Sequence, residues 1–331
     1  MTEQLVNVGY DVIGIDAKYF PRNLKCVSVG LQSGVSQIIK DIRDVQEEDL
    51  KGAEAVVHLA ALSNDPMGEL NPERTSQINY VATIRLAQIA KKVGARRFIF
   101  SSSCSVYGAR QGEILQENSE PIPVTAYAKS KVDAERDLIP LADRSFAPVI
   151  LRNATAYGLS PSMRLDLVVN NLVACAYATG SIVLLSDGMA WRPQVHIRDI
   201  GLAVQKCLET PIDRISSQVF NVGENSENYT VREIAAIVKE ASPGSAIEFD
   251  PKGGKDSRSY RVDFSKIRDW LKFRPAWNVR KGVHELRQAL KGEAFSSEEF
   301  RNTRFYRVPY LTGLVEKGLL DRDLRWRTRK S

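Results

Sequence analysis

The stretch NYVATIRLAQIAKKVGARRFIFSSS, residues 79–103, joins a helical pattern to a buried strand and so indicates the fold class. Ala82 and Leu86 lie at helical spacing on an apolar stripe, and Gly94 is a suitable residue to end that helix. The last eight residues of the stretch form an apolar strand that ends in hydroxyls. A helix that leads directly into a buried strand is the repeating unit of an α/β protein.

The same alternation of strands and helices extends along the chain on both sides. Residues 53–61 form a nearly continuous apolar run, as expected of a strand that is buried on both faces. Such alternation predicts a parallel, doubly wound sheet with right-handed crossovers. Further strands are predicted at residues 11–16, 35–39, 147–158 and 217–223, further helices at residues 125–139 and 230–242, and a strand followed by a helix within residues 187–209.

The composition is that of an ordinary folded protein. The chain has 331 residues, of which 43% are hydrophobic and 26% charged, enough for one large domain or two smaller ones. No apolar run approaches the ~20 residues that a membrane-spanning helix needs. The first residues include Glu3 and lack the basic segment of a signal peptide. We therefore expect a cytoplasmic protein with no membrane contact.

The net charge of +6 comes largely from basic residues that gather in residues 252–274 and 322–330. We interpret them first as solvated surface, next as a site for an anionic small substrate, and last as a nucleic-acid surface. No RNA-binding or DNA-reading motif accompanies them, so we predict no nucleic-acid partner. The four cysteines form no CxxC pair and the three histidines lack ligand spacing. Neither a disulfide nor a metal site is predicted.

Polar residues follow several predicted strands, and ligands of such sheets bind beyond the carboxyl ends of the strands. Asp16 could accept hydrogen bonds from both ribose hydroxyls of an adenine dinucleotide, which favours NAD, although Asp also ends many strands as a turn residue. Asp41 and Ile42 could border the adenine, and a simple turn is at least as good an interpretation. Ser103 and Ser105 could bond a substrate oxygen or could cap a turn.

Tyr127 and Lys131 are four residues apart on a predicted helix and therefore share one face. A free tyrosine has a pKa of ~10, and a neighbouring ammonium lowers that value by favouring the phenolate. A phenol tuned in this way can remove a hydroxyl proton while hydride leaves the same carbon. Such a pair also occurs by chance on exposed helices. Here it follows a serine-ended strand within an α/β pattern, which favours a catalytic role.

A set of motifs in one order resembles the extended short-chain dehydrogenase/reductases of the sugar-nucleotide epimerase/dehydratase group. This family implies an NAD-binding, Rossmann-like domain with a smaller, interleaved C-terminal substrate lobe. The division implied is residues 1–158 and 190–224 for the first part, and residues 159–189 and 225–331 for the second. The motifs are HLAA (58–61), SSSCSVYG (101–108), YAKSK (127–131), LRNATAYG (151–158), RPQVHIRD (192–199) and FNVG (220–223).

The resemblance also implies residue roles. Tyr127 would be the base and acid, Lys131 would bind the nicotinamide ribose and tune Tyr127, and Ser103 would bond the sugar hydroxyl. The NAD site would comprise Asp16, Asp41, Ile42, Leu59, Ala60, Ala61, Asn79, Ser101, Tyr127 and Lys131. The nucleotide-sugar site would comprise Ser105, Asn153, Arg164, Asp166 and, at the diphosphate, Arg192 and Arg258.

Two departures from the family pattern bear on the reaction. Dehydratases of the family usually carry an acidic pair just after the serine or threonine hydroxyl, where this chain has Cys104 and Ser105, so 4,6-dehydration is disfavoured. Thr155 stands where an Asn is common, with Asn153 nearby, which leaves the substrate geometry open. The family often forms a homodimer through a bundle that includes the tyrosine helix. The segment 295–331 could pack over the substrate lobe or form a dimer contact.

Residues 3–16 match the end of the family's first helix and its second strand. The family's first strand and glycine-rich turn, which binds the cofactor pyrophosphate, have no counterpart in the sequence as given. A start codon placed too late, a cut chain or a decayed copy would each explain this, and we favour the first. We expect the chain as given to bind NAD weakly and to have low stability.

The resulting prediction is an NAD-dependent epimerase that acts on a nucleotide-activated sugar through a transient ketone. One alternative is a nucleotide-sugar ketoreductase or dehydrogenase, which uses the same residues. The other is a relative without turnover that keeps the fold for a binding role. The missing glycine-rich turn favours this last alternative, and the retained Ser103, Tyr127 and Lys131 argue against it.

Overall fold

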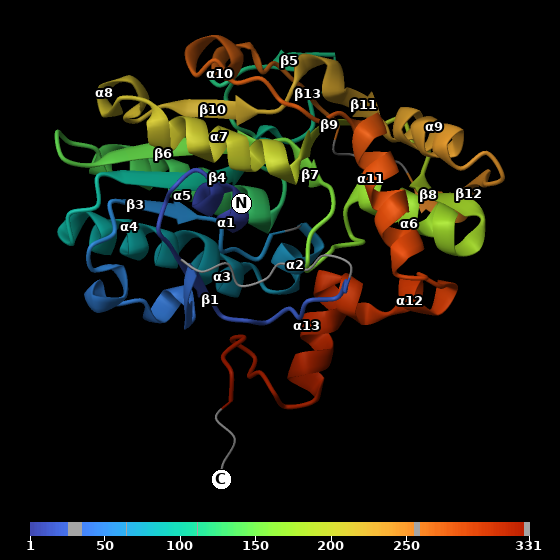
Figure 1. Cartoon of the computed structure of the whole chain (residues 1–331), viewed down its shortest axis with the longest axis horizontal. Coiled ribbons are helices and arrows are strands. Elements are labelled where there is room, and N and C mark those ends of the chain that lie inside the picture. The colour runs from blue at the N-terminus through green and yellow to red at the C-terminus, as the bar shows by residue number, and fades with distance from the viewer. Residues whose placement is uncertain (26–34, 64, 111, 255–258, 328–331) are drawn as a thin grey trace.

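The computed structural model describes residues 1–25, 35–63, 65–110, 112–254 and 259–327. Its centre is a sheet of four parallel strands in the order β10, β6, β4, β3 (Figure 1). All seven residues of β6 are buried, as expected for a strand covered on both faces. The parallel α/β class predicted from the sequence is therefore confirmed. The strands are β3 (Ala55–His58), β4 (Arg97–Ser103), β6 (Ala147–Asn153) and β10 (Val219–Val222).

Alternate residues of the central strands point into two different hydrophobic clusters. Phe98 and Phe100 pack against helices on one face, whereas Ile99 packs into the cluster on the other face. Figure 1 shows α7 crossing one face of this sheet. The first face is covered by α4 (Ala82–Lys92) and α5 (Ala126–Leu138), and the second by α7 (Ile197–Glu209), α8 (Ile212–Ile215) and α10 (Ser265–Trp270).

The sheet is not continuous. β1 (Val12–Asp16) and β2 (Val35–Ile39) form a parallel pair of their own. Among the described strands, none hydrogen-bonds this pair to β3. α1 (Thr2–Asn7) lies against α7, where the Gln4 amide donates to the carbonyl oxygen of Arg198 at 2.9 Å. Within the part of the chain that the structure describes, packing and loops hold the pair β1–β2, without a ladder to the main sheet.

The second half of the chain builds a lobe around α6 (Val168–Thr179), α9 (Val231–Ala241) and α11 (Val279–Gly292), which share one hydrophobic cluster. The chain leaves this lobe for β9 (Trp191–His196), α7 and β10 and then returns, so the two parts interleave, and their exact division stays a prediction. The remaining strands are β5 (Ile114–Leu115), β7 (Thr155–Tyr157), β8 (Ser181–Ser186), β11 (Asn228–Thr230), β12 (Ala246–Gly254) and β13 (Arg261–Val262).

The C-terminal segment packs against the segment that follows β1. Leu311, Leu320 and Leu324 bury against a cluster that contains Ile42. The indole N–H of Trp326 donates to the carbonyl oxygen of Ala17 at 2.6 Å. The remaining helices and turns are α2 (Asp65–Leu70), α3 (Pro72–Ser76), α12 (Ser297–Arg301), α13 (Arg307–Glu316), η1 (Ile42–Asp44), η2 (Glu47–Leu50), η3 (Gln77–Val81), η4 (Cys104–Tyr107), η5 (Ile139–Leu141), η6 (Asn225–Glu227) and η7 (Thr303–Phe305).

Candidate functional site

The structure brings Ser103, Tyr127 and Lys131 together. Thr125 caps α5 by accepting the amide of Ala128 at 3.2 Å, which starts the helix just before Tyr127. Ser103, the last residue of β4, hydrogen-bonds the Tyr127 hydroxyl. One turn along the helix, the Lys131 ammonium lies 5.8 Å from the centre of the Tyr127 ring. The three residues predicted to be catalytic therefore form one cluster at the carboxyl end of β4.

Lys131 is almost completely buried, with 2% of its surface exposed. Its ammonium donates to the carbonyl oxygen of Ser101 at 2.7 Å and lies 4.5 Å from the centre of the Phe100 ring. Burial lowers the pKa of Lys131 to about 7, and the Glu135 carboxylate opposes that shift. The ammonium is therefore held in place by a carbonyl, an aromatic face and one nearby carboxylate.

The expected lowering of the Tyr127 pKa is not found in this structure. Burial raises the pKa of Tyr127 to about 12, outweighing the hydrogen bond from Ser103, which acts in the opposite direction. The negative charge of Asp65 raises it further, and the positive charge of Arg164 lowers it. The prediction of a lowered pKa is wrong for this structure because burial removes water from the phenol. Without that water the charged phenolate is disfavoured.

Two predicted substrate contacts carry unused acceptor atoms. The Ser105 hydroxyl oxygen and the Asn153 Oδ1 are buried and have no hydrogen-bond partner within the described part of the chain. The Asn153 Nδ2 donates to the Ser101 hydroxyl at 3.0 Å, which fixes the direction of the amide. Buried polar atoms are rarely left unpaired, because their desolvation is costly. These two atoms mark a place where polar groups of a ligand would be bound.

The predicted adenosine end lies beyond β1. Asp16 ends β1 on the surface, and its carboxylate accepts the Lys18 amide at 2.6 Å. Asp41 accepts two hydrogen bonds from the Arg43 guanidinium at 2.9 and 2.6 Å and one from the Tyr19 hydroxyl at 3.0 Å. Burial acts against ionisation of Asp41, yet the hydrogen bonds from Arg43 hold its pKa below the usual range. Asp41 is therefore already engaged by its own neighbours.

The loop after β3 supplies the other predicted cofactor contacts. Leu59 is 47% exposed, whereas Ala60 and Ala61 are half-buried. Asn79 is fully buried and braces this loop: it accepts the Leu62 amide at 2.8 Å and donates to the Ser130 hydroxyl at 3.2 Å. Asn79 thus links the loop to α5. Ile42, also predicted for this site, belongs to the apolar cluster beneath the C-terminal helix.

The predicted arginine contacts are divided between two places. Arg164 forms a two-pronged pair with Asp166 at 2.9 and 3.0 Å and also donates to the Ser63 hydroxyl at 2.9 Å. Arg307 of α13 stacks on the Phe20 ring at 3.6 Å. Burial and the charge of Arg164 lower the pKa of Arg307 to about 10. Arg164 is therefore the positive charge that acts on Tyr127, and its pairing with Asp166 partly balances it.

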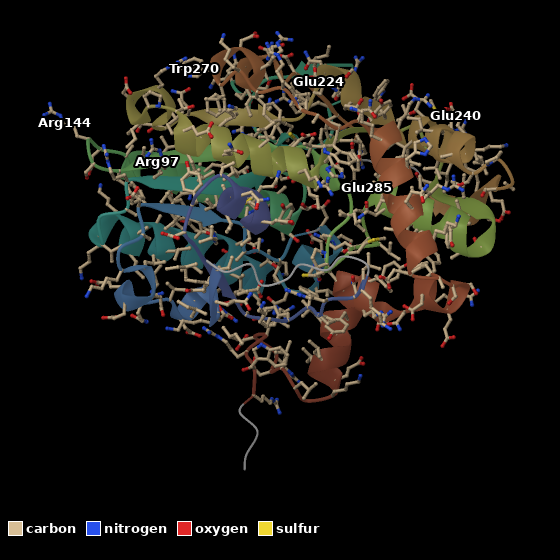
Figure 2. All side chains as sticks on the ribbon, viewed as in Figure 1. Arg97, Arg144, Glu224, Glu240, Trp270 and Glu285 are labelled. Atoms are coloured by element: carbon tan, nitrogen blue, oxygen red, sulfur yellow. The ribbon has the colours of Figure 1, made fainter. Side chains whose placement is uncertain are left out.

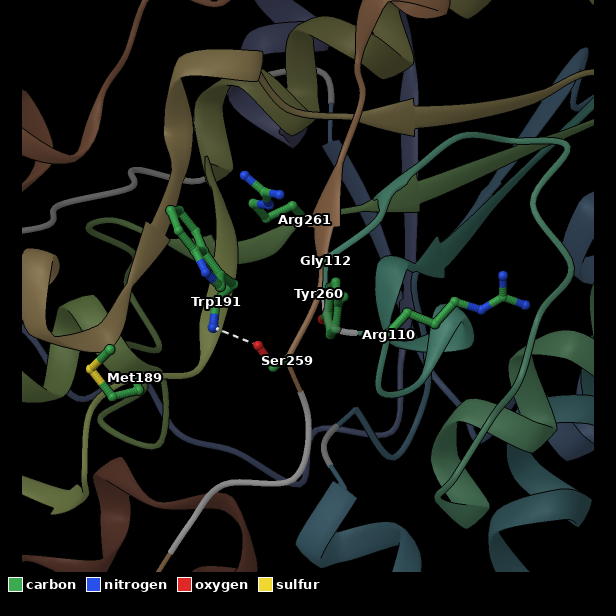
Figure 3. A pocket seen from close by; sticks show the side chains of 7 residues that line it. All are labelled: Arg110, Gly112, Met189, Trp191, Ser259, Tyr260 and Arg261. Carbon is green, nitrogen blue, oxygen red and sulfur yellow. Dashed lines mark hydrogen bonds between the residues drawn. The ribbon is translucent and has the colours of Figure 1, made fainter.

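Arg192 lies on β9 and follows Trp191, which lines a cavity of about 250 Å³ together with Tyr260 and Arg261 (Figure 3). Its guanidinium lies 5.7 Å from the centre of the Tyr260 ring. Among the residues that line this cavity, Arg261 lies over the Trp191 ring, and the Trp191 backbone amide donates to the Ser259 hydroxyl at 3.1 Å. Arg258, predicted for the same diphosphate site, lies outside the described residues.

Sequence reasoning missed the polar groups beneath the site. Glu135 and Arg152 form a buried ion pair at 2.7 Å. His58 is buried near Lys131, and its Nε2 forms a hydrogen bond with the Thr83 hydroxyl at 2.8 Å. Burial lowers the pKa of His58 to about 3. Two signals were available: Glu135 follows Lys131 at helical spacing, and Arg152 interrupts an otherwise apolar strand.

No helix in the described ranges combines the length and the apolarity needed to cross a bilayer. In the same ranges, no three or more Cys, His, Asp or Glu side chains converge as metal ligands.

Together, the parallel α/β sheet and the Ser, Tyr and Lys cluster define a Rossmann-like nucleotide-binding protein of oxidoreductase type. Residues 1–223 match the sequence model of the NAD dependent epimerase/dehydratase family, and the chain belongs to this family. The family includes NAD-dependent nucleotide-sugar epimerases, decarboxylases and dehydratases.

Relatives of known name cover most of the chain. UDP-glucuronic acid decarboxylases 1, 2 and 4 of Arabidopsis thaliana are 28–30% identical over 76–90% of this chain, which spans 57–68% of their length. UDP-glucose 4-epimerase of Bacillus subtilis is 23% identical, with 86% of this chain and 89% of the epimerase covered. The solved structure of UDP-glucuronic acid 4-epimerase from Bacillus cereus, in complex with UDP-glucuronic acid and NAD, is 25% identical with a TM-score of 0.75, covering 88% of this chain and 94% of that one.

The residues at two ends of the site suit the family's cofactor. The exposed carboxylate of Asp16 could accept ribose hydroxyls, and the buried ammonium of Lys131 could donate to the second ribose. A glycine-rich turn that opens a helix and could cradle a pyrophosphate is not found among the described residues. Asp16 and Lys131 therefore suit the two riboses of NAD. Among the described residues, no glycine-rich turn is present to bind the pyrophosphate.

Proposed function

We propose that this protein is an NAD-dependent epimerase of a nucleotide-activated sugar and that the reaction passes through a transient ketone. The observation that carries the proposal is the cluster of Ser103, Tyr127 and Lys131, next to the unpaired acceptors of Ser105 and Asn153. A proton-transfer pair beside unsatisfied polar atoms suits a polyhydroxylated substrate.

Tyr127 removes the proton of a sugar hydroxyl and later returns it, with Ser103 bonding both that oxygen and the phenol. When bound, NAD would supply a positively charged ring for reversible hydride transfer. Lys131 would hold the nicotinamide ribose and would add positive charge near the phenol. A raised pKa of about 12 keeps the phenol protonated at neutral pH, so nearby positive charge has to favour the phenolate during the reaction.

The proposal assigns the cofactor and substrate contacts predicted from the sequence. For NAD these are Asp16, Asp41, Ile42, Leu59, Ala60, Ala61, Asn79, Ser101, Tyr127 and Lys131. Asp41 can bind NAD only if its carboxylate gives up a hydrogen bond from Arg43 or Tyr19. For the nucleotide sugar the residues are Ser105, Asn153, Arg164, Asp166, Arg192 and Arg258.

Epimerisation is favoured over dehydration by the residues that follow Ser103. Cys104 is buried with its pKa raised, and Ser105 is a neutral hydroxyl, so this short helical turn offers no acid or base. Asp65 is the carboxylate whose charge acts on Tyr127, and it already accepts the Thr125 hydroxyl at 2.7 Å. Elimination of water from the sugar therefore lacks a carboxylate in the turn that follows Ser103.

The direct test is to incubate the purified protein and NAD with UDP-glucose and with UDP-glucuronic acid, following the sugar by proton NMR. An epimerase converts the sugar without a lasting change in absorbance at the reduced-cofactor band. A ketoreductase or dehydrogenase changes that absorbance in proportion to product. If NAD and the sugars bind but neither conversion nor absorbance change follows, the binding-only alternative is correct.

We also propose a homodimer that uses the surface of α4 and α5, and a cytoplasmic location. Light scattering after size exclusion measures the first, and fractionation of cells that express the full chain measures the second. A mass equal to the 37.0 kDa chain at micromolar concentration would contradict the dimer.

A further inference from the structure

Glu135 lies four residues after Lys131 on α5 and faces the sheet with 4% of its surface exposed. Its carboxylate accepts hydrogen bonds from residues of two central strands. On β4 the donor is the Ser102 hydroxyl. On β6 the donor is Arg152, whose Nη2 and Nε lie 2.7 and 3.1 Å from Oε2. One side chain thus ties the helix of Tyr127 and Lys131 to the strands that end in Ser103 and Asn153.

The partner of Glu135 is itself held firmly. Arg152 donates through Nη1 to the Tyr107 hydroxyl at 3.0 Å and to the carbonyl oxygen of Glu117 at 3.2 Å. Tyr107 donates in turn to the Asn221 Oδ1 on β10 at 2.7 Å. The network therefore runs from α5 through β4 and β6 to β10, entirely in the interior. A buried network with all members paired fixes geometry closely.

Glu135 also determines the electrostatic surroundings of Lys131. The groups that face the ammonium are His58 from β3, Phe100 and the carbonyl of Ser101 from β4, and Tyr127 from its own helix. His58 and Tyr127 are both neutral near pH 7, since burial lowers the pKa of the first and raises that of the second. From β6, Arg152 approaches as the partner of Glu135 and carries a positive charge. Lys131 and Glu135 lie four residues apart on α5 and are both almost completely buried. The Glu135 carboxylate is therefore the negative charge that acts on the ammonium, although its own hydrogen bonds go to Ser102 and Arg152.

We propose that Glu135 is a positioning residue for the reaction: it keeps Lys131 charged and holds Tyr127 in register with Ser103. The role in turnover rests on the proposed function, whereas the effect on Lys131 does not. An ion pair that lies too far from the ammonium to act on it would leave the Lys131 titration and the pH profile of kcat unchanged, so the two explanations can be separated.

The experiment compares the wild type with Glu135→Gln, which keeps the shape and removes the charge. Lysine labelled with ¹³C at Cε is titrated by NMR, and the Lys131 signal is assigned from a Lys131→Arg sample. We expect the midpoint of Lys131 to fall, so that its charged fraction at pH 7 drops by about threefold or more. A midpoint equal to that of the wild type would overturn the proposal.

The matched control is Glu227→Gln. Glu227 is also a buried carboxylate, accepting the Val279 amide at 2.8 Å and the Tyr229 hydroxyl at 3.0 Å, but it belongs to η6 and contacts the first residue of α11. It should lower stability without moving the Lys131 midpoint. If Glu135→Gln does not fold because Arg152 is left uncompensated, the double variant Glu135→Gln with Arg152→Met removes both charges. Its Lys131 midpoint must also fall, or the proposal is wrong.

Activity gives the second readout. If the protein turns over a sugar, Glu135→Gln should lower kcat at neutral pH by about tenfold or more with little change in KM, and the loss should shrink at lower pH, where Lys131 regains its proton. Equal loss at every pH would contradict the charge role. Should no sugar react, the proposed function fails while the NMR titration still decides whether Glu135 controls Lys131.

Discussion

The indole N–H of Trp326 donates to the carbonyl oxygen of Ala17, the residue that directly follows β1, at 2.6 Å. The Tyr19 hydroxyl continues this contact by sharing its one proton between the carbonyl oxygen of Leu324 at 2.5 Å and the Asp41 carboxylate at 3.0 Å. Residues more than three hundred positions apart thus close one surface at the predicted adenosine end. The segment 319–327 therefore packs on the first part of the chain and not on the substrate lobe.

Removing this segment should destabilise the protein. Truncation after Gly318 exposes the cluster that Leu320 and Leu324 help to bury, at a cost of about 2–5 kcal/mol. Thermal unfolding measures the loss. Truncation after Arg327 is the comparison, because it keeps Leu320, Leu324 and Trp326. Equal melting temperatures for the two truncations would show that the segment contributes nothing to stability.

Tyr127→Phe should abolish turnover while leaving the fold intact. Loss of a group that transfers the proton typically lowers the rate by about 10²–10⁴-fold. The measurement is conversion of a UDP-sugar followed by NMR. Tyr306→Phe is the control, because its hydroxyl donates to the carbonyl of Phe300 away from the cluster. A Tyr127→Phe protein that retains more than a tenth of the rate would exclude Tyr127 as the base.

The buried ammonium should make stability depend on pH. The pKa of Lys131 is about 7 in the folded chain and ~10.4 when exposed, so the unfolded chain binds more protons between these values. The free energy of unfolding should therefore rise between pH 7 and pH 9, by up to about 2–3 kcal/mol from this group. The same contribution is lost as the pH falls through 7. Denaturant titrations of the wild type and Lys131→Met, which lacks this slope, provide the check; identical slopes would contradict it.

Glu285 should matter more for stability than Glu240, although both are paired glutamates (Figure 2). Glu285 accepts His196 Nε2 at 2.9 Å and the Leu159 amide at 3.2 Å, and the His196 ring stacks on Trp277 at 4.1 Å. Glu285→Ala leaves these donors unpaired and should cost about 2–3 kcal/mol. Glu240→Ala breaks an exposed pair and should cost less than about 1 kcal/mol. Chemical denaturation of both variants tests the difference, and equal costs would refute it.

The isolated pair β1–β2 should open more readily than the central sheet. Two strands alone form a weak unit, and the described strands provide no ladder from this pair to β3. Amide exchange followed by mass spectrometry should show β1 and β2 exchanging well before β4 and β6, through a local opening. Exchange of all four strands at one rate would mean that the sheets unfold as a single unit.

Much of the fold could be predicted from residues 79–103 and from the same alternation of strands and helices elsewhere. The spacing of apolar residues and the choice of turn residues are local properties of a chain. The helix of Tyr127 begins after Thr125 as its sequence indicates, and β4 ends in the serines. The direction of the Tyr127 pKa could not be predicted, because it depends on how much water the fold removes. Neither could the division of the sheet, since pairing joins residues far apart along the chain.

By itself the sequence determined the parallel α/β class, the family, and the residues of the Ser103, Tyr127 and Lys131 cluster. The fold class, the family and these residues follow from residue type and spacing, which are properties of the sequence before it folds. The tertiary structure alone decided that Glu135 and Arg152 sit beneath that cluster, that Asp41 is engaged by Arg43 and Tyr19, and that Trp326 reaches Ala17. Burial and long-range contact have no local signature, because they arise only when distant segments exclude water together.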